Sequence, residues 1–351
     1  MKKGLAAALT GTFLLVALLL LGGFNLAKPR ILVLHSADRN TPSAIRVNDG
    51  IRGVLDKNRQ PLSLRWHYLA IDSLPDEAHR EDAGKEGQRA VEQFNPDVIL
   101  AVDDEAQQYV ASRYAGKARP KIVFAAIDRE PAAYGYAGAA NVTGVSEVLP
   151  LAAIRETLLL LRQQKPARVA VIGNTSPTGK GELRQVQAFD WAPHTLVELQ
   201  SPADFASWQA AVKGLDGRAD VLLVLAHDGL KAGPASRDIV AGTTVVRWIE
   251  AHSKPLPVGI RAEFVERGGG LGIGPSSRAM GEAAATMTMT WLKSASASAP
   301  PLADGTHYSV AVRDAPLRAR NVSLPSVYIE AARLNNLYFP QIPEPVNKAA
   351  P

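Results

Sequence analysis

The sequence predicts an α/β protein of two doubly wound lobes with parallel sheets, preceded by an N-terminal apolar helix. Unbroken runs of Val, Ile and Leu alternate with helical patterns, which is typical of parallel sheets covered by helices on both faces. This alternation stops and restarts near Gly144, so we expect two lobes rather than one. An uncharged apolar stretch stands at the N-terminus, which is why a separate helix is expected there.

The N-terminal stretch favours export of the rest of the chain. Lys2 and Lys3 precede apolar residues from Leu5 to Gly23, a pattern typical of a secretory signal or of a single membrane helix. The stretch approaches the roughly 20 residues that span a bilayer core. The best cleavage candidate, Asn25-Leu26-Ala27, has Asn where a small residue is expected. We therefore expect residues 1–27 to be either a signal peptide or a membrane anchor, and the body to be periplasmic or otherwise extracytoplasmic.

Composition excludes several classes of function. The 351 residues include no Cys, which rules out disulfides, thiolate metal sites, cysteine nucleophiles and a lipidated cysteine anchor. The net charge is +5, and Lys and Arg are scattered without a run of five, so we expect no nucleic-acid partner.

The first lobe is predicted from residues 29–143. Its expected strands and helices alternate in this order: "RILVLHS", "SAIRVNDGIRGVLDKN", "LSLRWHYLAI", "HREDAGKEGQRAVEQF", "DVILAVDD", "EAQQYVASRY" and "KIVFAAID". Helical segments show apolar residues at helical spacing, such as Ile45, Ile51, Val54 and Leu55.

The second lobe is predicted from residues 144–262. Its elements are expected in this order: "PLAAIRETLLLLRQQ", "RVAVIGN", "GKGELRQVQAFDWA", "HTLVELQ", "ADFASWQAAVKGLD", "DVLLVLAHD", "GTTVVRWIEAHS" and "LPVGI". The passage from Asn141 to Glu147 is thus a candidate interdomain crossing, although a single larger sheet without a hinge is the alternative.

Two further crossings are expected, near residues 261–270 and 294–306. They would return about residues 270–296 to the first lobe and about 306–340 to the second, and would leave 341–351 as a Pro-rich tail. The glycine-rich "ERGGGLGIGPSS" is interpreted as a flexible turn in the first of these crossings.

Polar residues follow the predicted strands, where open parallel sheets bind ligands. Those that we consider are His35, Ser36, Asp103, Asp104, Asp128, Asn174, Thr175, Ser176, His227, Asp228, Arg261 and Glu263. Small hydroxyl and amide side chains beside helix N-termini suit a carboxylate, and Asp suits an ammonium group. Each of these residues could instead be only a helix cap.

Signs of catalysis are weak, so we predict no enzyme. "GNTSPTGKG" misses the phosphate-loop spacing between Gly173 and Gly179, and Gly181 replaces the magnesium-binding hydroxyl. The seven His residues show no metal-ligand spacing, and no G-x-S-x-G elbow is present, so we expect neither a metal nor another cofactor.

The segment "PKIVFAAIDREPAAYGYAGAANVTGVSEVLPLAAIRETLLLLRQQKPARVAVIGNTSP" resembles the ABC-transporter substrate-binding proteins of the tryptophan/tyrosine-binding type, most specifically around Asn141 to Ser146. The resemblance extends more loosely to "PDVILAVDDEAQ", "ADFASWQAAVKGLDGRADVLLVLAHDGL" and "YSVAVRDAPLRARNVSLP". It implies a type I periplasmic-binding-protein architecture, in which two Rossmann-like lobes joined by three crossings close on a small ligand.

By position, the resemblance implies a cleft lined by His35, Ser36, Asp128, Ser146, Asn174 and Asp228. The family's Pro directly after the strand-end Asp is displaced here to Pro131 by Arg129 and Glu130, and "GIGPSSR" replaces its aromatic turn. These departures leave the ligand open among amino acids and other small organic anions.

We therefore expect an exported substrate-binding protein of an ABC-type uptake system, with a permease as partner and compatible with a monomer. A membrane-tethered ligand-sensing accessory protein is the alternative, and an enzyme is a weaker one. The expected ligand-binding residues are His35, Ser36, Asp103, Asp128, Ser146, Asn174, Thr175, Asp228 and Arg261.

Overall fold

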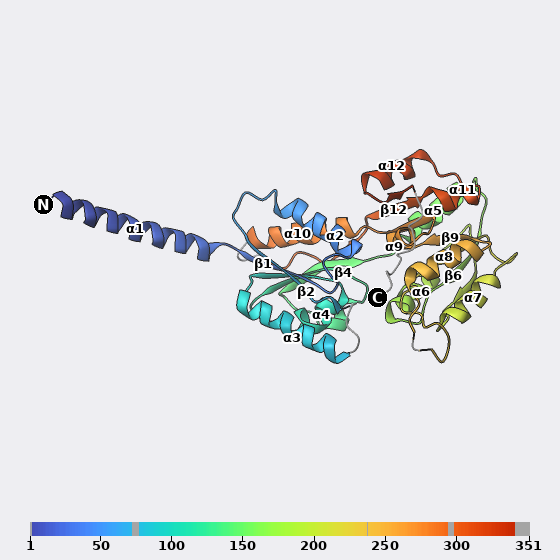
Figure 1. Ribbon diagram of the computed structural model, residues 1–351, viewed down its shortest axis with the longest axis horizontal. Coiled ribbons are helices and arrows are strands. Elements are labelled where there is room, and N and C mark those ends of the chain that lie inside the picture. Colours follow the sequence, from blue (N-terminus) through green and yellow to red (C-terminus); the bar gives the residue numbers. More distant parts are fainter. Residues whose placement is uncertain (1, 72–76, 237, 294–297, 341–351) are drawn as a thin grey trace, which may run out of the picture. The chain divides into compact units, whose positions relative to one another are not determined.

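The protein consists of two compact α/β units (Figure 1). A computed structural model describes residues 2–71, 77–236, 238–293 and 298–340. The first unit comprises Met1–Val145 with Gly281–Ala303, and the second comprises Ser146–Met280 with Asp304–Pro351, in each case as far as the chain is described. The chain therefore passes between the units three times, after Val145, Met280 and Ala303. The predicted tail, residues 341–351, lies outside the described residues.

The first unit is built on a six-stranded sheet in the order β11-β5-β4-β3-β1-β2. Its strands are β1 (Arg30–His35), β2 (Ser63–Tyr68), β3 (Val98–Val102), β4 (Lys121–Ile127), β5 (Val142–Glu147) and β11 (Ala303–Gly305). β1 pairs in parallel with β2 and β3, and β3 pairs in parallel with β4. β3 is buried along its whole length, which agrees with its unbroken apolar sequence.

Helices cover both faces of this sheet. They are α2 (Pro42–Leu55), α3 (Glu77–Phe94), α4 (Asp104–Tyr109) and α10 (Ser277–Lys293), with short 3₁₀ turns at Ala111–Tyr114 and Pro131–Tyr134. Leu32 and Leu34 of β1 pack with Val91 of α3 and Ala106 of α4. Figure 1 shows α2 and α10 on the other face of the sheet.

The second unit is built on a seven-stranded sheet in the order β13-β12-β10-β9-β8-β6-β7. Its strands are β6 (Arg168–Ile172), β7 (Thr195–Gln200), β8 (Val221–Val224), β9 (Leu256–Gly259), β10 (Leu271–Pro275), β12 (Tyr308–Arg313) and β13 (Tyr338–Phe339). β6 to β10 are parallel, whereas β12 runs antiparallel to β10. The predicted α/β class with parallel-dominated sheets is thus confirmed.

Two apolar layers flank the second sheet. The helices are α5 (Leu151–Leu161), α6 (Pro177–Ala188), α7 (Phe205–Lys213), α8 (Gly242–His252), α9 (Ala262–Glu266), α11 (Asp314–Ala319) and α12 (Ser326–Leu334). Val169 and Val171 of β6 pack on the side of α5 and α6, and their neighbours Ala170 and Ile172 pack on the side of α7 and α8. This alternation is the two-residue period of a strand buried on both faces.

The interpretation of the glycine-rich segment as a flexible turn is wrong. Leu271–Pro275 is strand β10, and its first four residues are buried between β9 and β12. A Cβ atom on Gly272 would lie 2.7 Å from the carbonyl oxygen of Arg261, and one on Gly274 would clash with the backbone of Ile260. The glycines therefore permit close packing rather than flexibility. The second passage follows β10, later than the expected 261–270.

The N-terminal apolar residues form helix α1 (Lys2–Ala27). Phe13, Leu15 and Leu18 on it are exposed. Over the part of the chain that the structure describes, no helix has the length and apolarity needed to cross a membrane. Signal peptide and anchor both stay predictions.

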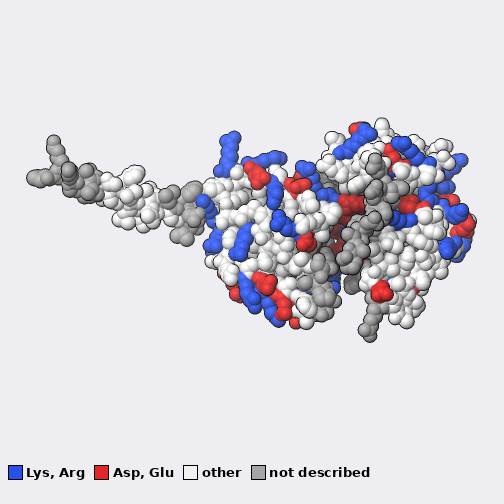
Figure 2. All heavy atoms as spheres, viewed as in Figure 1, with Lys and Arg blue, Asp and Glu red and all other residues white. Residues whose placement is uncertain are grey.

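Basic and acidic side chains are interspersed over the visible face of each unit. Figure 2 shows this mixture, with Lys and Arg in blue and Asp and Glu in red.

Candidate functional site

The carboxyl ends of the first unit's parallel strands bring together several of the predicted residues. His35 ends β1, Asp103 follows β3, and Asp128 follows β4. Because these three strands are parallel neighbours, their ends lie along one edge of the sheet.

Ser36 forms hydrogen bonds that stabilise this edge of the sheet. Its hydroxyl donates a hydrogen bond to the carbonyl oxygen of Val102 at 3.1 Å and accepts one from the backbone N–H of Ala106 at 2.7 Å. Ser36 is 3% exposed. The hydroxyl thus joins the end of β3 to the first turn of α4. This is a structural role, which the sequence allowed as an alternative to ligand contact.

His35 is enclosed in an aromatic cluster. Its ring is fully buried and stacks on Tyr68 and Trp66 of β2, with ring centroids 5.0 and 6.1 Å apart. Neither ring nitrogen has a hydrogen-bond partner among the described residues. Burial lowers the pKa of His35 to about 4, so the ring is neutral near pH 7.

An acidic group stands at the ends of β3 and β4. Asp104 accepts hydrogen bonds from the backbone N–H of Asp128 at 3.2 Å and of Arg129 at 3.3 Å, and another from the hydroxyl of Tyr134. Burial, with a contribution from the Asp128 carboxylate, raises the pKa of Asp104. Asp103 precedes it with a positive φ of 66°. Asp104 and Tyr134 thus organise the loop that carries Asp128.

In the second unit, Asn174 connects the ends of two strands by hydrogen bonds. Its backbone N–H donates to the carbonyl oxygen of Ala226 at 2.8 Å, and its Nδ2 donates to that of Asp228 at 2.6 Å. Its Oδ1 accepts from the backbone N–H and the hydroxyl of Ser176, at 3.1 and 2.6 Å. The loops after β6 and β8 are therefore fixed to each other at the N-terminus of α6.

Arg261, after β9, is held by two carboxylates. Its Nε and Nη2 donate to Oε1 of Glu182 at 3.1 and 2.9 Å, and its Nη1 donates to Oε1 of Glu147. The side chains of Glu147 and Glu182 are only 8% and 3% exposed. Glu182 also accepts from the backbone N–H of Ala226 at 2.7 Å. Within the second unit, this network joins Glu147 to the ends of β8 and β9 through α6.

Asp228 and Thr175 are the more accessible predicted residues of this unit. The side chain of Asp228 is 63% exposed and forms an ion pair with Arg267 at 2.8 Å. Arg267 also contacts Nε2 of the buried His227 at 3.0 Å. Thr175 is exposed beside Ser176, whose hydroxyl caps α6. Ser146 is half-buried on β5.

Sequence reasoning missed Glu147, Glu182, Tyr134 and Arg267 as parts of these clusters. Glu147 lay within the predicted crossing, but nothing in the sequence linked it to Arg261, 114 residues away. Glu182 lies on a predicted helix, but the sequence does not show that its side chain faces the strand ends.

Comparison with known proteins identifies the fold. No protein-family profile and no curated protein sequence matches the chain. Among solved structures, it resembles a ligand-free, open substrate-binding protein with adhesive properties from Clostridium difficile, with a TM-score of 0.65 and 17% identity over 85% of this chain and 96% of that one.

Two further structures have the same architecture. One is an ABC domain in complex with L-Trp from Streptococcus pneumonia, with a TM-score of 0.60 and 18% identity over 87% of this chain and 98% of that one. The other is a periplasmic ribose ABC transporter protein from Conexibacter woesei, with a TM-score of 0.53 and 11% identity over 84% and 95%. Together with the two units and their three chain passages, these likenesses show that the chain has the type I periplasmic-binding fold.

Proposed function

We propose that this chain is the exported substrate-binding protein of an ABC-type uptake system, which binds a small ligand at the carboxyl ends of its parallel strands and delivers it to a permease. The observation that carries the proposal is the polar carboxyl edge of both sheets. In each unit, buried strands end in hydrogen-bonded loops that hold Asp, Ser, Thr or Asn side chains in place. Open parallel sheets use this edge for ligands.

The ligand that we propose is an amino acid or another small organic anion. Support comes from the fold shared with a protein solved with L-Trp. Asp128 and Asp228 would face the ammonium group, and Thr175, with the N-terminus of α6 beside it, would face the carboxylate. Ser36, Asn174 and Arg261 would hold the strand ends in place without contacting the ligand. Their polar atoms already form hydrogen bonds at those strand ends.

A thermal-shift screen of the full chain tests this function. Amino acids, small carboxylates and, as a contrasting class, sugars are added one at a time. A ligand at 100 times its dissociation constant adds about 2.7 kcal/mol to the free energy of unfolding, which raises the melting temperature measurably. A shift with an amino acid or a small carboxylate supports the proposal. A shift with sugars alone refutes the ligand class, and no shift with any compound refutes the proposed function.

Calorimetry with the ligand so found tests the residues. Asp128→Asn should weaken binding by about 2–5 kcal/mol if its charge meets the ammonium group. Thr175→Ala should weaken it by about 1 kcal/mol through one lost hydrogen bond. Asp216→Asn, at an exposed position of the second unit, is the matched control and should leave affinity unchanged. Equal affinities for all three variants would show that Asp128 and Thr175 only shape their loops.

Cell fractionation tests the export that we propose. A cleaved signal would leave a soluble mature chain that begins near Lys28. A retained helix would leave Lys2 on a chain that sediments with membranes. A full-length chain in the cytosolic fraction would refute export.

A further inference from the structure

The edge of the first sheet at which its parallel strands begin is strongly cationic. Because β1 to β4 are parallel neighbours, the segments that lead into them lie along one edge, opposite to the carboxyl ends described above. Residues 28–30, 56–62, 95–97 and 115–121, with Lys293 at the end of α10, carry eight Lys and Arg side chains and two Asp side chains. We call this the amino edge of the first unit.

The carboxyl edge of the same sheet has the opposite charge. Residues 36–41, 103–104 and 128–130 carry five acidic side chains and two Arg side chains. β1 has 6 residues, so it separates the two edges by about 20 Å. The first unit therefore has a gradient of charge along its strands, and it is positive where the chain arrives from α1.

Some charges of the amino edge are engaged within the unit. Asp97 accepts a hydrogen bond from the backbone N–H of Arg30 at 2.9 Å and forms an ion pair with Arg119. Nζ of Lys121 donates to the carbonyl oxygen of Trp291 at 3.1 Å. The first contact offsets the charge of Asp97, and the second places the end of α10 beside the start of β4.

Four exposed cations form the outer surface of the amino edge, namely Lys57, Arg59, Lys117 and Lys293. The first two precede β2, and the other two lie near the start of β4. β2 and β4 are three strand spacings apart in the sheet, about 15 Å. Figure 2 shows Lys and Arg side chains over the end of the first unit at which β1 begins. The cations thus form a broad surface rather than a site for one ion.

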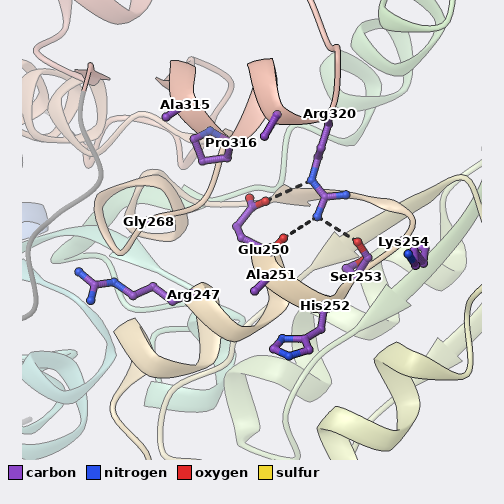
Figure 3. Close-up of a pocket in the computed structure, with 11 residues that line it drawn as sticks. Arg247, Glu250, Ala251, His252, Ser253, Lys254, Gly268, Ala315, Pro316 and Arg320 are labelled. Carbon is purple, nitrogen blue, oxygen red and sulfur yellow. Dashed lines mark hydrogen bonds and ion pairs between the residues drawn. The ribbon is translucent and has the colours of Figure 1, made fainter.

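The corresponding edge of the second unit pairs several of its arginines internally. Arg168, at the start of β6, forms an ion pair with Asp220 at 3.1 Å. Near the start of β9, Arg320 pairs with Glu250 at 3.4 Å and donates to the carbonyl oxygen of Ser253 at 3.0 Å, where these residues line a groove of about 810 Å³ (Figure 3). These arginines contribute little net charge to that edge.

The apolar helix α1 joins the first unit at its amino edge. The consecutive residues Phe13, Leu14, Leu15 and Val16 are between 47% and 71% exposed. At 3.6 residues per turn they expose apolar surface on every face of the helix, which is typical of a helix covered by lipid or by other protein. Only residues 28 and 29 separate α1 from β1, and two residues span at most about 7 Å. A partner that covers α1 therefore also meets the cationic surface.

A bilayer of anionic phospholipid fits both features. Its interior suits the apolar residues of α1, and its headgroups attract basic residues next to a membrane-bound segment. A second copy of this chain would bring a second cationic surface to the same place, which is repulsive. An acidic soluble protein would match the cations but would leave the apolar residues of α1 in water.

We propose that the surface formed by Lys57, Arg59, Lys117 and Lys293 binds anionic phospholipid headgroups and holds the amino edge of the first unit on the membrane in the chain that keeps α1. The carboxyl edge, with the candidate ligand residues, then lies about 20 Å farther from the headgroups. This inference goes beyond the proposed function and does not depend on which ligand is bound.

Energy transfer from single dyes tests the proposal on the full chain. The chain has no Cys, so Gln60→Cys and Asn40→Cys each carry one donor dye, at exposed positions of the amino and carboxyl edges. Vesicles contain an acceptor-labelled lipid and either phosphatidylglycerol with phosphatidylcholine or phosphatidylcholine alone. On the anionic vesicles we expect stronger transfer from position 60 than from position 40. This difference should shrink when salt rises from about 0.05 M to 0.5 M, because exposed charges are screened.

The neutral vesicles separate headgroup charge from the effect of α1. The apolar helix can bind to both kinds of vesicle, whereas only phosphatidylglycerol attracts the cations. We therefore expect transfer from position 60 to be weaker on phosphatidylcholine alone, and the difference between the two positions to be lost there.

Substitutions then locate the surface. A variant with Lys57→Gln, Arg59→Gln, Lys117→Gln and Lys293→Gln should lower transfer from position 60 on anionic vesicles to the level seen on neutral ones. Near an anionic surface each cation changes the equilibrium about fivefold, so the loss of four is decisive. The matched control removes the same charge from exposed positions of the second unit, with Lys165→Gln, Lys180→Gln, Arg184→Gln and Lys231→Gln, and should keep the transfer.

Three outcomes would overturn the proposal. Equal transfer from positions 60 and 40 on anionic vesicles would show that the amino edge does not face the membrane. Equal transfer from position 60 on both kinds of vesicle would show that headgroup charge has no part in it; these two comparisons keep all four cations, so they give an answer even if the variant does not fold. Full transfer in a folded four-site variant would place the contact elsewhere. A chain that fails here but still shows a thermal shift with its ligand would leave the proposed function intact.

Discussion

Arg261 and Glu182, 79 residues apart in the sequence, form a two-donor ion pair in which Nε and Nη2 of the arginine both reach Oε1 of the glutamate, at 3.1 and 2.9 Å. The carboxylate is 3% exposed. Glu147, near the start of the second unit, contacts the same guanidinium. Arg261 thus holds the strand ends in place.

Removing the guanidinium should destabilise the second unit. Arg261→Ala leaves two nearly buried carboxylates without this partner, so we expect the free energy of unfolding to fall by about 3–5 kcal/mol. Chemical denaturation of the full chain measures this. The control is Arg333→Ala, which breaks an exposed pair with Glu330 and should change stability by less than about 1 kcal/mol. Equal denaturation midpoints for the two variants would contradict the assignment.

The hydroxyl of Ser36 should contribute to the stability of the first unit. Ser36→Ala removes the acceptor of the Ala106 N–H and the donor to Val102, so we expect a loss of about 1–3 kcal/mol. Ser201→Ala, at an exposed position, provides the comparison and should be neutral. Unchanged stability of Ser36→Ala in denaturant titrations would argue that water replaces both bonds.

The buried ring of His35 should make stability depend on pH. Its pKa is lowered to about 4 in the folded chain from 6.5. The unfolded chain therefore binds a proton below about pH 6.5 that the folded chain does not, and the free energy of unfolding should fall by about 3 kcal/mol as pH falls to about 4. His35→Phe keeps an aromatic ring without the proton site.

Denaturant titrations between pH 4 and pH 6.5 should show a smaller slope for His35→Phe than for the parent. Some slope should persist, because burial also lowers the pKa of His227. Identical slopes for both chains would mean that His35 is not enclosed as described.

Two glycine substitutions should act in opposite directions. A Cβ atom on Gly144 of β5 would clash with the carbonyl oxygen and the ring of Phe124, so Gly144→Ala should destabilise the fold by 3 kcal/mol or more, roughly the upper range for overpacking. Gly53 lies within α2 with no atom near its Cβ position, so Gly53→Ala should stabilise by about 1 kcal/mol. Thermal melts of both variants provide the check, and a melting temperature for Gly144→Ala at or above that of the parent would contradict the packing.

The sequence was sufficient for the class of fold because burial leaves a local signature. Strands such as Val98–Val102 are apolar on both faces, and this pattern needs no knowledge of their partners. Leu271–Pro275 lacks that signature, since its glycines fit only when β9 is already beside them. The sequence of this segment alone therefore predicts a turn.

The candidate site was less predictable because the same residue types serve as caps and as ligand contacts. Ser36 and Asn174 were found as strand-end polar residues, but their partners Ala106 and Asp228 come from other strands and loops. Which polar atoms are already bonded is a property of the folded edge. No pattern along the chain encodes it.

Ser36 has a consequence for the time scale on which the first unit moves. Its backbone N–H and its hydroxyl both donate hydrogen bonds to the carbonyl oxygen of Val102, and the hydroxyl also accepts one from the backbone N–H of Ala106. These three hydrogen bonds connect β1, β3 and α4. Local fraying of α4, a helix of only 6 residues, would have to open all of them together. The amide protons of Ser36 and Ala106 should therefore exchange with solvent at nearly the same slow rate, as members of one cooperative unit.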